Sequence, residues 1–175
     1  MFIAHAPMGY IMSTSFLKRY GKLPATTSMV LLFGVLGSIA PDFDMIYFYL
    51  IDNRQTHHHN YITHWPIIWA TLLAASTIWL RSSHKSKSPW LAFIFSLGGF
   101  IHIVLDSFVG DIWWFSPFAN EPYAMFTVPA RFSPWWLNFV FHWSFAVELI
   151  ICAWAMLTYR RRVNKLHSNT CSKSL

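Results

Sequence analysis

The stretch PWLAFIFSLGGFIHIVLDSFV, residues 89–109, decides the fold class of this chain. A helix needs about 20 apolar residues to cross the hydrocarbon core of a bilayer, and this segment supplies them. Four more segments are similarly apolar. Residues 28–51 and 135–159 are long enough to span alone, whereas residues 2–17 and 65–80 are shorter. The sequence therefore predicts an all-α fold, a polytopic membrane helix bundle of four to five transmembrane helices.

The composition also indicates a membrane protein. Only 11% of the residues are charged and 55% are hydrophobic, whereas soluble domains are about 25% charged. A soluble fold would leave much of this apolar surface uncovered. The net charge of +6 could indicate nucleic acid, but the basic residues flank apolar segments instead of forming a surface interleaved with aromatic residues. We expect the lipid bilayer as partner and no nucleic acid.

Positive charges gather on one side of the predicted bundle. Eleven of the 13 basic residues lie between segments one and two, between segments three and four, or after segment five: Lys18, Arg19, Lys22, Arg81, Lys85, Lys87, Arg160, Arg161, Arg162, Lys165 and Lys173. Cytoplasmic loops of membrane proteins carry such an excess, so we expect an outside N-terminus and a cytoplasmic C-terminus. Residues 1–163 form the predicted membrane domain, and residues 164–175 a polar, disordered cytoplasmic tail.

Residues able to bind a cation recur near the outward ends of the segments. They are His5, Asp42, Asp44, His57, His58, His59, His64, His102, Asp106 and His142. Ionisable groups in membrane segments are expensive and mark functional sites. His102 and Asp106 are four residues apart and share a helix face, although an intrahelical hydrogen bond would explain this pair as well.

The other candidates also have simpler explanations. Asp42 and Asp44 point apart on a regular helix, unless a break at Pro41 turns both toward one centre; one of them could instead cap a helix. His57 and His58 could belong to a wet, titrating loop, and His142 could be a hydrogen-bonded core residue.

Depth in the membrane provides an independent test. At a rise of 1.5 Å per residue, the two aspartates after Pro41 lie roughly 21–24 Å from the inner end of their segment, and His102 and Asp106 roughly 20–26 Å. His5 begins segment one, and His59 and His64 flank the start of segment three, where Thr63 is the expected N-cap. All candidates therefore converge on the outer third of the bilayer. Histidine and carboxylate ligands without cysteine suit Zn²⁺ best, with Mn²⁺ or Fe²⁺ as alternatives, and enough ligands exist for one or two ions.

The ordered motifs resemble those of the YdjM-like family of inner-membrane proteins. The matching elements are His5, the run Gly37–Asp44 (GSIAPDFD), His59-x-x-x-Thr63-His64, and His102-x-x-x-Asp106-Ser107 followed by Gly110 and Pro117. The Arg and Gly of the family's His-Arg-Gly-x-Thr-His are Asn60 and Tyr61 here. The order of ligands is also reminiscent of the zinc-dependent phospholipase C and single-strand nuclease enzymes. Their terminal His-x-x-x-Glu motif is missing from this chain, because Ala146 stands four residues after His142, where the motif has Glu.

The resemblance implies a metal-dependent hydrolase, acting on an ester or phosphoester of a small-molecule or lipid substrate at the outer face of the inner membrane. With the ligand set, it gives six expected metal ligands: His5, Asp42, His59, His64, His102 and Asp106. Asp44 is expected to orient a ligand histidine or to act as general base, and His58 to shuttle protons. The alternatives are a metal transporter or sensor with the same ligands, or a structural membrane protein with a pH-sensitive histidine loop.

Overall fold

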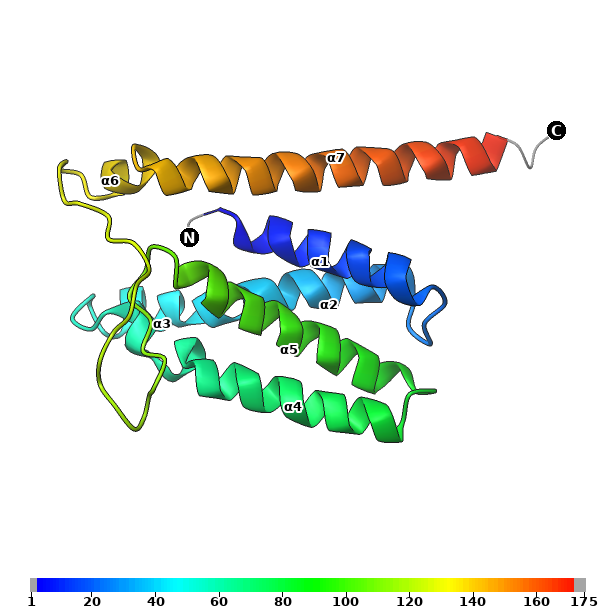
Figure 1. Cartoon of the computed structure of the whole chain (residues 1–175), viewed down its shortest axis with the longest axis horizontal. Coiled ribbons are helices and arrows are strands. Elements are labelled where there is room, and N and C mark those ends of the chain that lie inside the picture. The colour runs from blue at the N-terminus through cyan, green and yellow to red at the C-terminus, as the bar shows by residue number, and fades with distance from the viewer. Residues whose placement is uncertain (1–2, 172–175) are drawn as a thin grey trace.

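Helices make up most of the computed structural model, which describes residues 3–171 (Figure 1). In chain order the elements are α1 (His5–Tyr20), α2 (Thr27–Ile39), the 3₁₀ turn η1 (Pro41–Phe43), α3 (Asp44–Leu50), η2 (His58–Asn60), η3 (Ile62–His64), α4 (Pro66–Ser82), α5 (Lys87–Asp106), α6 (Trp136–Val140) and α7 (Trp143–Cys171). The described residues contain no β-strand, only an isolated bridge between Ile112 and Tyr123. The predicted all-α class is confirmed for this part of the chain.

Helix α5 lies at the centre of the bundle, between α2 and α4, while α1 packs on α2 and α7 lies along α1 (Figure 1). Small residues let α2 and α5 approach to backbone contact. A Cβ atom on Gly98 of α5 would lie 2.8 Å from the backbone oxygen of Gly34 and the backbone nitrogen of Ser38 on α2. Glycine at this position is therefore required by the close approach of the two helices.

Two of the predicted segments are broken. Helix α2 and the following η1–α3 unit are bent by 57° at Pro41, so the predicted break is confirmed. The segment 135–159 divides into α6 and α7, where the sequence predicted one helix. At the division, the Nδ1 atom of His142 accepts a hydrogen bond from the backbone N–H of Ser144 in the first turn of α7, as the side chain of a cap residue does.

The lengths of the helices support fewer spans than the sequence predicted. Among the described residues, α5 alone is long and apolar enough to cross a membrane, and the bent pair of α2 with η1–α3 adds a second if it counts as one span. Large apolar side chains on the outside of α4 and α7 are exposed, among them Ile78 at 65% and Ile150 at 66%. Such side chains suit contact with lipid. Four to five spans stay a prediction.

Helix α7 is longer than expected. It continues through residues 164–171, which the sequence assigned to a disordered tail, and residues 172–175 lie outside the described part of the chain. Each residue added to an existing helix gains a hydrogen bond without a new nucleation cost. The helix therefore extends past the end of the apolar segment and beyond the rest of the bundle (Figure 1).

Candidate metal centre

Six side chains from five separate elements meet at one end of the bundle, the end with α3 and α6 in Figure 1. They come from the start of α1, from the three 3₁₀ turns and from the last turns of α5: His5, Asp42, His59, His64, His102 and Asp106. These are the six expected metal ligands. The structure thus brings together residues separated by up to 101 positions in the sequence, as the depth argument predicted.

Asp106 lies at the centre of this cluster and is 1% exposed. Its Oδ2 is 2.9 Å from Nε2 of His102, and its Oδ1 is 3.1 Å from Nε2 of His5. The Nε2 atoms of His59 and His64 are 3.6 and 3.8 Å from the same Oδ2. Four imidazoles therefore direct the same ring nitrogen toward one buried carboxylate.

Asp42 closes the cluster on its more exposed side. Its Oδ1 lies 3.7 Å from Nε2 of His64 and 3.6 Å from Nε2 of His102, and these two nitrogens are 3.4 Å apart. A tetrahedral zinc ion with ligands at about 2.0–2.1 Å separates its ligand atoms by about 3.3–3.4 Å. The separations of the Nε2 atoms of His64 and His102 from each other and from the carboxylates of Asp42 and Asp106 range from 2.9 to 3.8 Å. These four residues could hold a metal ion.

The opposite nitrogen of three of these imidazoles is bound to an oxygen acceptor. Nδ1 of His64 lies 2.5 Å from Oδ2 of Asp44, Nδ1 of His102 lies 2.8 Å from the Ser38 carbonyl oxygen, and Nδ1 of His59 lies 3.2 Å from the Asp111 carbonyl oxygen. An oxygen acceptor at Nδ1 places the proton there, which leaves the Nε2 lone pair directed into the cluster. The ring of His5 stacks on that of His102, with 3.7 Å between centroids.

Asp44 lies behind His64 and outside the group of Nε2 atoms. Its Oδ2 also accepts a hydrogen bond of 2.6 Å from the Thr63 hydroxyl. The 3₁₀ turn after Pro41 thus separates the two aspartates, so that Asp42 faces the cluster and Asp44 holds a histidine from outside. Thr63 is not the helix cap that the sequence suggested, because α4 begins at Pro66 with Trp65 as its N-cap residue.

The charges of the cluster favour a cation. Burial alone would lower the pKa of His64, but hydrogen bonds to the carboxylates of Asp42 and Asp44 raise this pKa to about 9. The pKa of His58 shifts in the opposite direction: burial and the neighbouring His64 lower it to about 4. The carboxylates therefore stabilise positive charge at the centre of the cluster, where a metal ion would lie.

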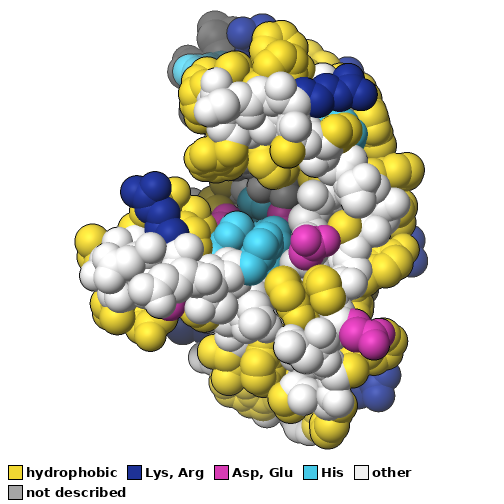
Figure 2. Space-filling model, turned by 90° about the vertical axis from the view of Figure 1, so that its left-hand side faces the viewer, with side chains coloured by type: hydrophobic (Ala, Val, Ile, Leu, Met, Phe, Trp, Pro, Cys, Tyr) yellow, Lys and Arg dark blue, Asp and Glu magenta, His cyan; other side chains and the backbone are white. Residues whose placement is uncertain are grey.

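A cavity of about 770 Å³ opens beside the cluster, and Asp42, His58 and His59 form part of its wall. Figure 2 shows histidine atoms at the bottom of a hollow, with acidic atoms next to them. His58 lies between the cavity and the buried histidines: its ring centroid is 4.0 Å from that of His59 and 5.5 Å from that of His64. A molecule in this cavity would reach the cluster from the side of Asp42.

The comparisons with known proteins give one family. The model of the family described as YdjM inner membrane protein matches residues 1–166. The chain belongs to the YdjM inner membrane protein family. This YdjM membership confirms the resemblance seen in the motifs and supports a location in the membrane. No curated protein and no solved structure matches the chain.

Within this YdjM chain, the candidate residue His142 lies apart from the cluster. It bonds through Nδ1 with Ser144, but it is only half-buried and is therefore not the core residue that the simpler explanation expected. Glu148 of α7 accepts a hydrogen bond of 2.6 Å from the backbone N–H of Ile3. Of the three oxygen atoms that hold the histidines, the sequence predicted the one on Asp44, which it expected to orient a ligand histidine, and missed the other two. Those two, on Ser38 and Asp111, are backbone carbonyls, which give no signal in the sequence.

Proposed function

We propose that this YdjM-family protein is a metal-dependent hydrolase that acts on an ester or phosphoester at the outer face of the inner membrane. The observation that carries the proposal is the convergence of four Nε2 atoms on Asp42 and Asp106, with Nδ1 of His59, His64 and His102 anchored by oxygen. Imidazoles held in this way are typical of metal centres, because the anchored Nδ1 fixes the tautomer and the ring orientation.

In this proposal His5, Asp42, His59, His64, His102 and Asp106 hold one or two divalent ions, and zinc suits the nitrogen and oxygen donors best. Asp44 acts as a positioning residue for His64, because its carboxylate contacts Nδ1 and not the centre of the cluster. A bound ion would supply Lewis-acid polarisation of the substrate oxygen and activation of water.

The protein's own groups would manage the proton and the substrate. Hydrolysis joins the hydroxyl of one water molecule to phosphorus or to the acyl carbon, breaks the bond to the ester oxygen, and transfers the remaining proton to that oxygen. His58 lines the cavity and contacts His59 and His64. With its pKa lowered to about 4 it is a neutral imidazole, which would accept this proton only transiently and pass it on to the leaving oxygen. The neighbouring wall of Val109, Phe126 and Phe139 would exclude bulk water from the reacting group.

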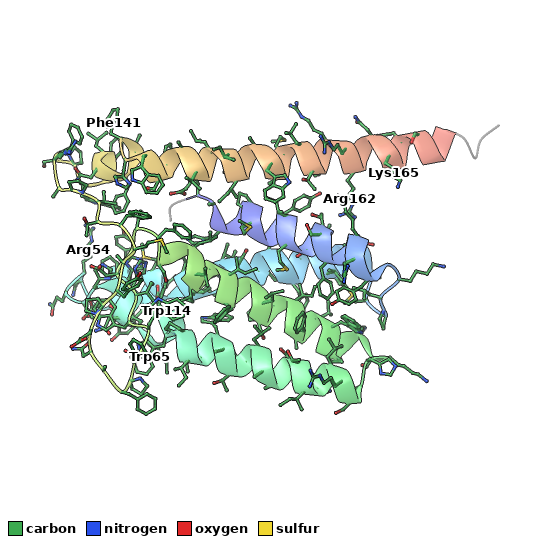
Figure 3. The ribbon with its side chains drawn as sticks, viewed as in Figure 1. Arg54, Trp65, Trp114, Phe141, Arg162 and Lys165 are labelled. Atoms are coloured by element: carbon green, nitrogen blue, oxygen red, sulfur yellow. The ribbon has the colours of Figure 1, made fainter. Side chains whose placement is uncertain are left out.

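We also propose a multi-pass topology of four to five spans, with the cluster outside and the C-terminus in the cytoplasm. In support, Arg162 and Lys165 lie at the end of the molecule opposite to Arg54, Trp65 and Trp114 (Figure 3). Basic residues favour the cytoplasmic side and tryptophans favour the membrane interface. Helices α1 and α4, with 16 and 17 residues, would then span with support from their neighbours.

Metal analysis of the purified protein tests the proposal. Wild type should contain about one or two zinc ions per chain, and His64→Ala and Asp106→Ala should lose most of this metal. The matched control is His142→Ala, which removes a histidine outside the cluster and should leave the content unchanged. Undiminished metal in both cluster variants would overturn the assignment.

Activity separates a hydrolase from a metal transporter or sensor with the same ligands. Wild type should hydrolyse generic esters or phosphodiesters, and a chelator should abolish the hydrolysis. Bound metal without chelator-sensitive turnover of any ester would contradict the enzymatic proposal and leave the transporter or sensor.

A further inference from the structure

The cavity beside the cluster has one polar end and a longer apolar wall. Its polar end is formed by Asp42, Asp111 and the run His57–His59. The rest of the wall comes from α3, from the loop before α6, and from α6 with its N-cap residue: Met45, Tyr49, Val109, Gly110, Ala124, Phe126, Thr127, Val128, Trp135 and Phe139. A volume of about 770 Å³ is within the range of small-molecule sites. Such a cavity suits a ligand with one polar group and one apolar part.

Large apolar side chains are exposed on both elements that border this cavity. Ile46 and Leu50 of α3 are 62% and 76% exposed, and Phe141, which follows α6, is 70% exposed. Trp135, which lines the cavity, is itself 56% exposed. In water such a patch would be unfavourable, but aromatic and aliphatic side chains of this kind belong at the interface of a bilayer. The border of the cavity therefore faces lipid.

One basic side chain lies next to this wall. The guanidinium carbon of Arg54 is 5.0 Å from the ring centroid of Tyr49, a residue that lines the cavity. Arg54 has a φ of 64°, in the left-handed region that costs energy for a residue with a Cβ atom. No Lys or Arg is found among the described residues that line the cavity. Arg54 thus offers a single planar donor for a phosphate group at the edge of an apolar cavity.

We propose that the substrate is a lipid phosphoester of the outer leaflet, an inference that rests on the proposed hydrolase function. The phosphate group lies at the polar end between Asp42 and the guanidinium of Arg54, and the apolar chain lies along Ala124, Phe126 and Phe139. The substrate reaches the cavity sideways from the bilayer, between α3 and α6.

A series of soluble phosphodiesters that share a nitrophenol leaving group tests the apolar part of this site. Alkyl chains of two, four and six carbons are compared with the protein in lipid nanodiscs. Burial of one methylene increases kcat/KM by at most about fourfold, so we expect a rise of at least about tenfold from two to six carbons. A rate independent of chain length would overturn the lipid assignment and favour a soluble phosphoester.

Two variants with matched controls locate the binding groups. Ala124→Trp fills the apolar wall and should remove the dependence of kcat/KM on chain length; Ala130→Trp, an exposed position of the same loop, should behave as wild type. Arg54→Gln should raise KM about tenfold with little change in kcat, and Arg131→Gln should change neither. Equal effects of a variant and its control would contradict the proposed site.

A binding experiment separates failure of this inference from failure of the hydrolase proposal. A phospholipid with a photoreactive acyl chain is cross-linked to the chelator-treated protein in nanodiscs, and the labelled peptides are identified by mass spectrometry. Labelling of residues 124–139 should fall at least about fivefold in Ala124→Trp, and Ala130→Trp should match wild type. Such binding without any turnover would reject the hydrolase alone, whereas labelling equal in both variants rejects the lipid site itself.

Discussion

Replacing Asp44 by asparagine should weaken metal binding while the cluster keeps its shape. Asp44 is 7% exposed, and its Oδ2 accepts from Nδ1 of His64 at 2.5 Å and from the Thr63 hydroxyl at 2.6 Å. Asparagine retains an acceptor oxygen and removes the negative charge. A charge-assisted hydrogen bond exceeds a neutral one by about 1–2 kcal/mol, which corresponds to about 5- to 30-fold in affinity.

A graded set of variants makes this prediction specific. Thr63→Val leaves the carboxylate charged and removes one hydroxyl donor, so it should cost about 1 kcal/mol, or about fivefold in affinity. His64→Ala removes a proposed ligand and should lower the affinity well below that of Asp44→Asn. The control is Asp52→Asn, because the Asp52 carboxylate accepts from Thr56 outside the cluster and should not affect the metal.

The assay is a zinc titration of detergent-purified protein against a chromophoric chelator of known affinity, with circular dichroism to verify the helical fold of each variant. The reasoning is refuted if Asp44→Asn binds zinc as tightly as wild type. It is also refuted if this variant loses as much affinity as His64→Ala, since Asp44 would then be a ligand itself.

Further predictions concern the bundle, its metal and its orientation. Gly98→Val should lower the free energy of unfolding by about 1–3 kcal/mol, because its side chain meets the α2 backbone; an unchanged midpoint in a detergent melt would contradict this close packing. Glu148→Ala should destabilise by about 1–3 kcal/mol, because the Ile3 N–H loses its partner inside the protein; a melt like that of wild type would contradict it. Zinc at 100 times its dissociation constant should add about 2.7 kcal/mol of stability, and Asp106→Ala should lack this gain; an equal gain in the variant would place the metal elsewhere. An alkaline phosphatase fused to the C-terminus should be inactive, and an active fusion would reverse the proposed orientation.

The convergence of the six candidate ligands could be predicted from the sequence because the predicted membrane segments restrict where each side chain can lie. Apolar segments fix the direction of each helix, and the helical rise then fixes the depth of His102 and Asp106 along α5. Charged and imidazole side chains are rare at such depths, so those that occur are informative. The same reasoning placed His5 beside them, although about 100 residues separate them in the chain.

Other features depend on tertiary contacts that no local pattern encodes. The roles of Asp42 and Asp44 follow from the turn after Pro41, which no periodicity specifies. The carbonyl oxygens that hold His59 and His102 belong to backbone whose position depends on the whole bundle. At the division between α6 and α7, one side chain, His142, contacts the backbone N–H of Ser144.

Zinc K-edge X-ray absorption of the purified, zinc-loaded protein tests the central claim most directly. The account predicts nitrogen and oxygen ligands at about 2.0–2.1 Å, with the outer-shell scattering of at least two imidazoles, and a weaker imidazole signal in His64→Ala combined with His102→Ala. A spectrum with sulfur at about 2.3 Å, or one unchanged in the double variant, would contradict the metal centre described here.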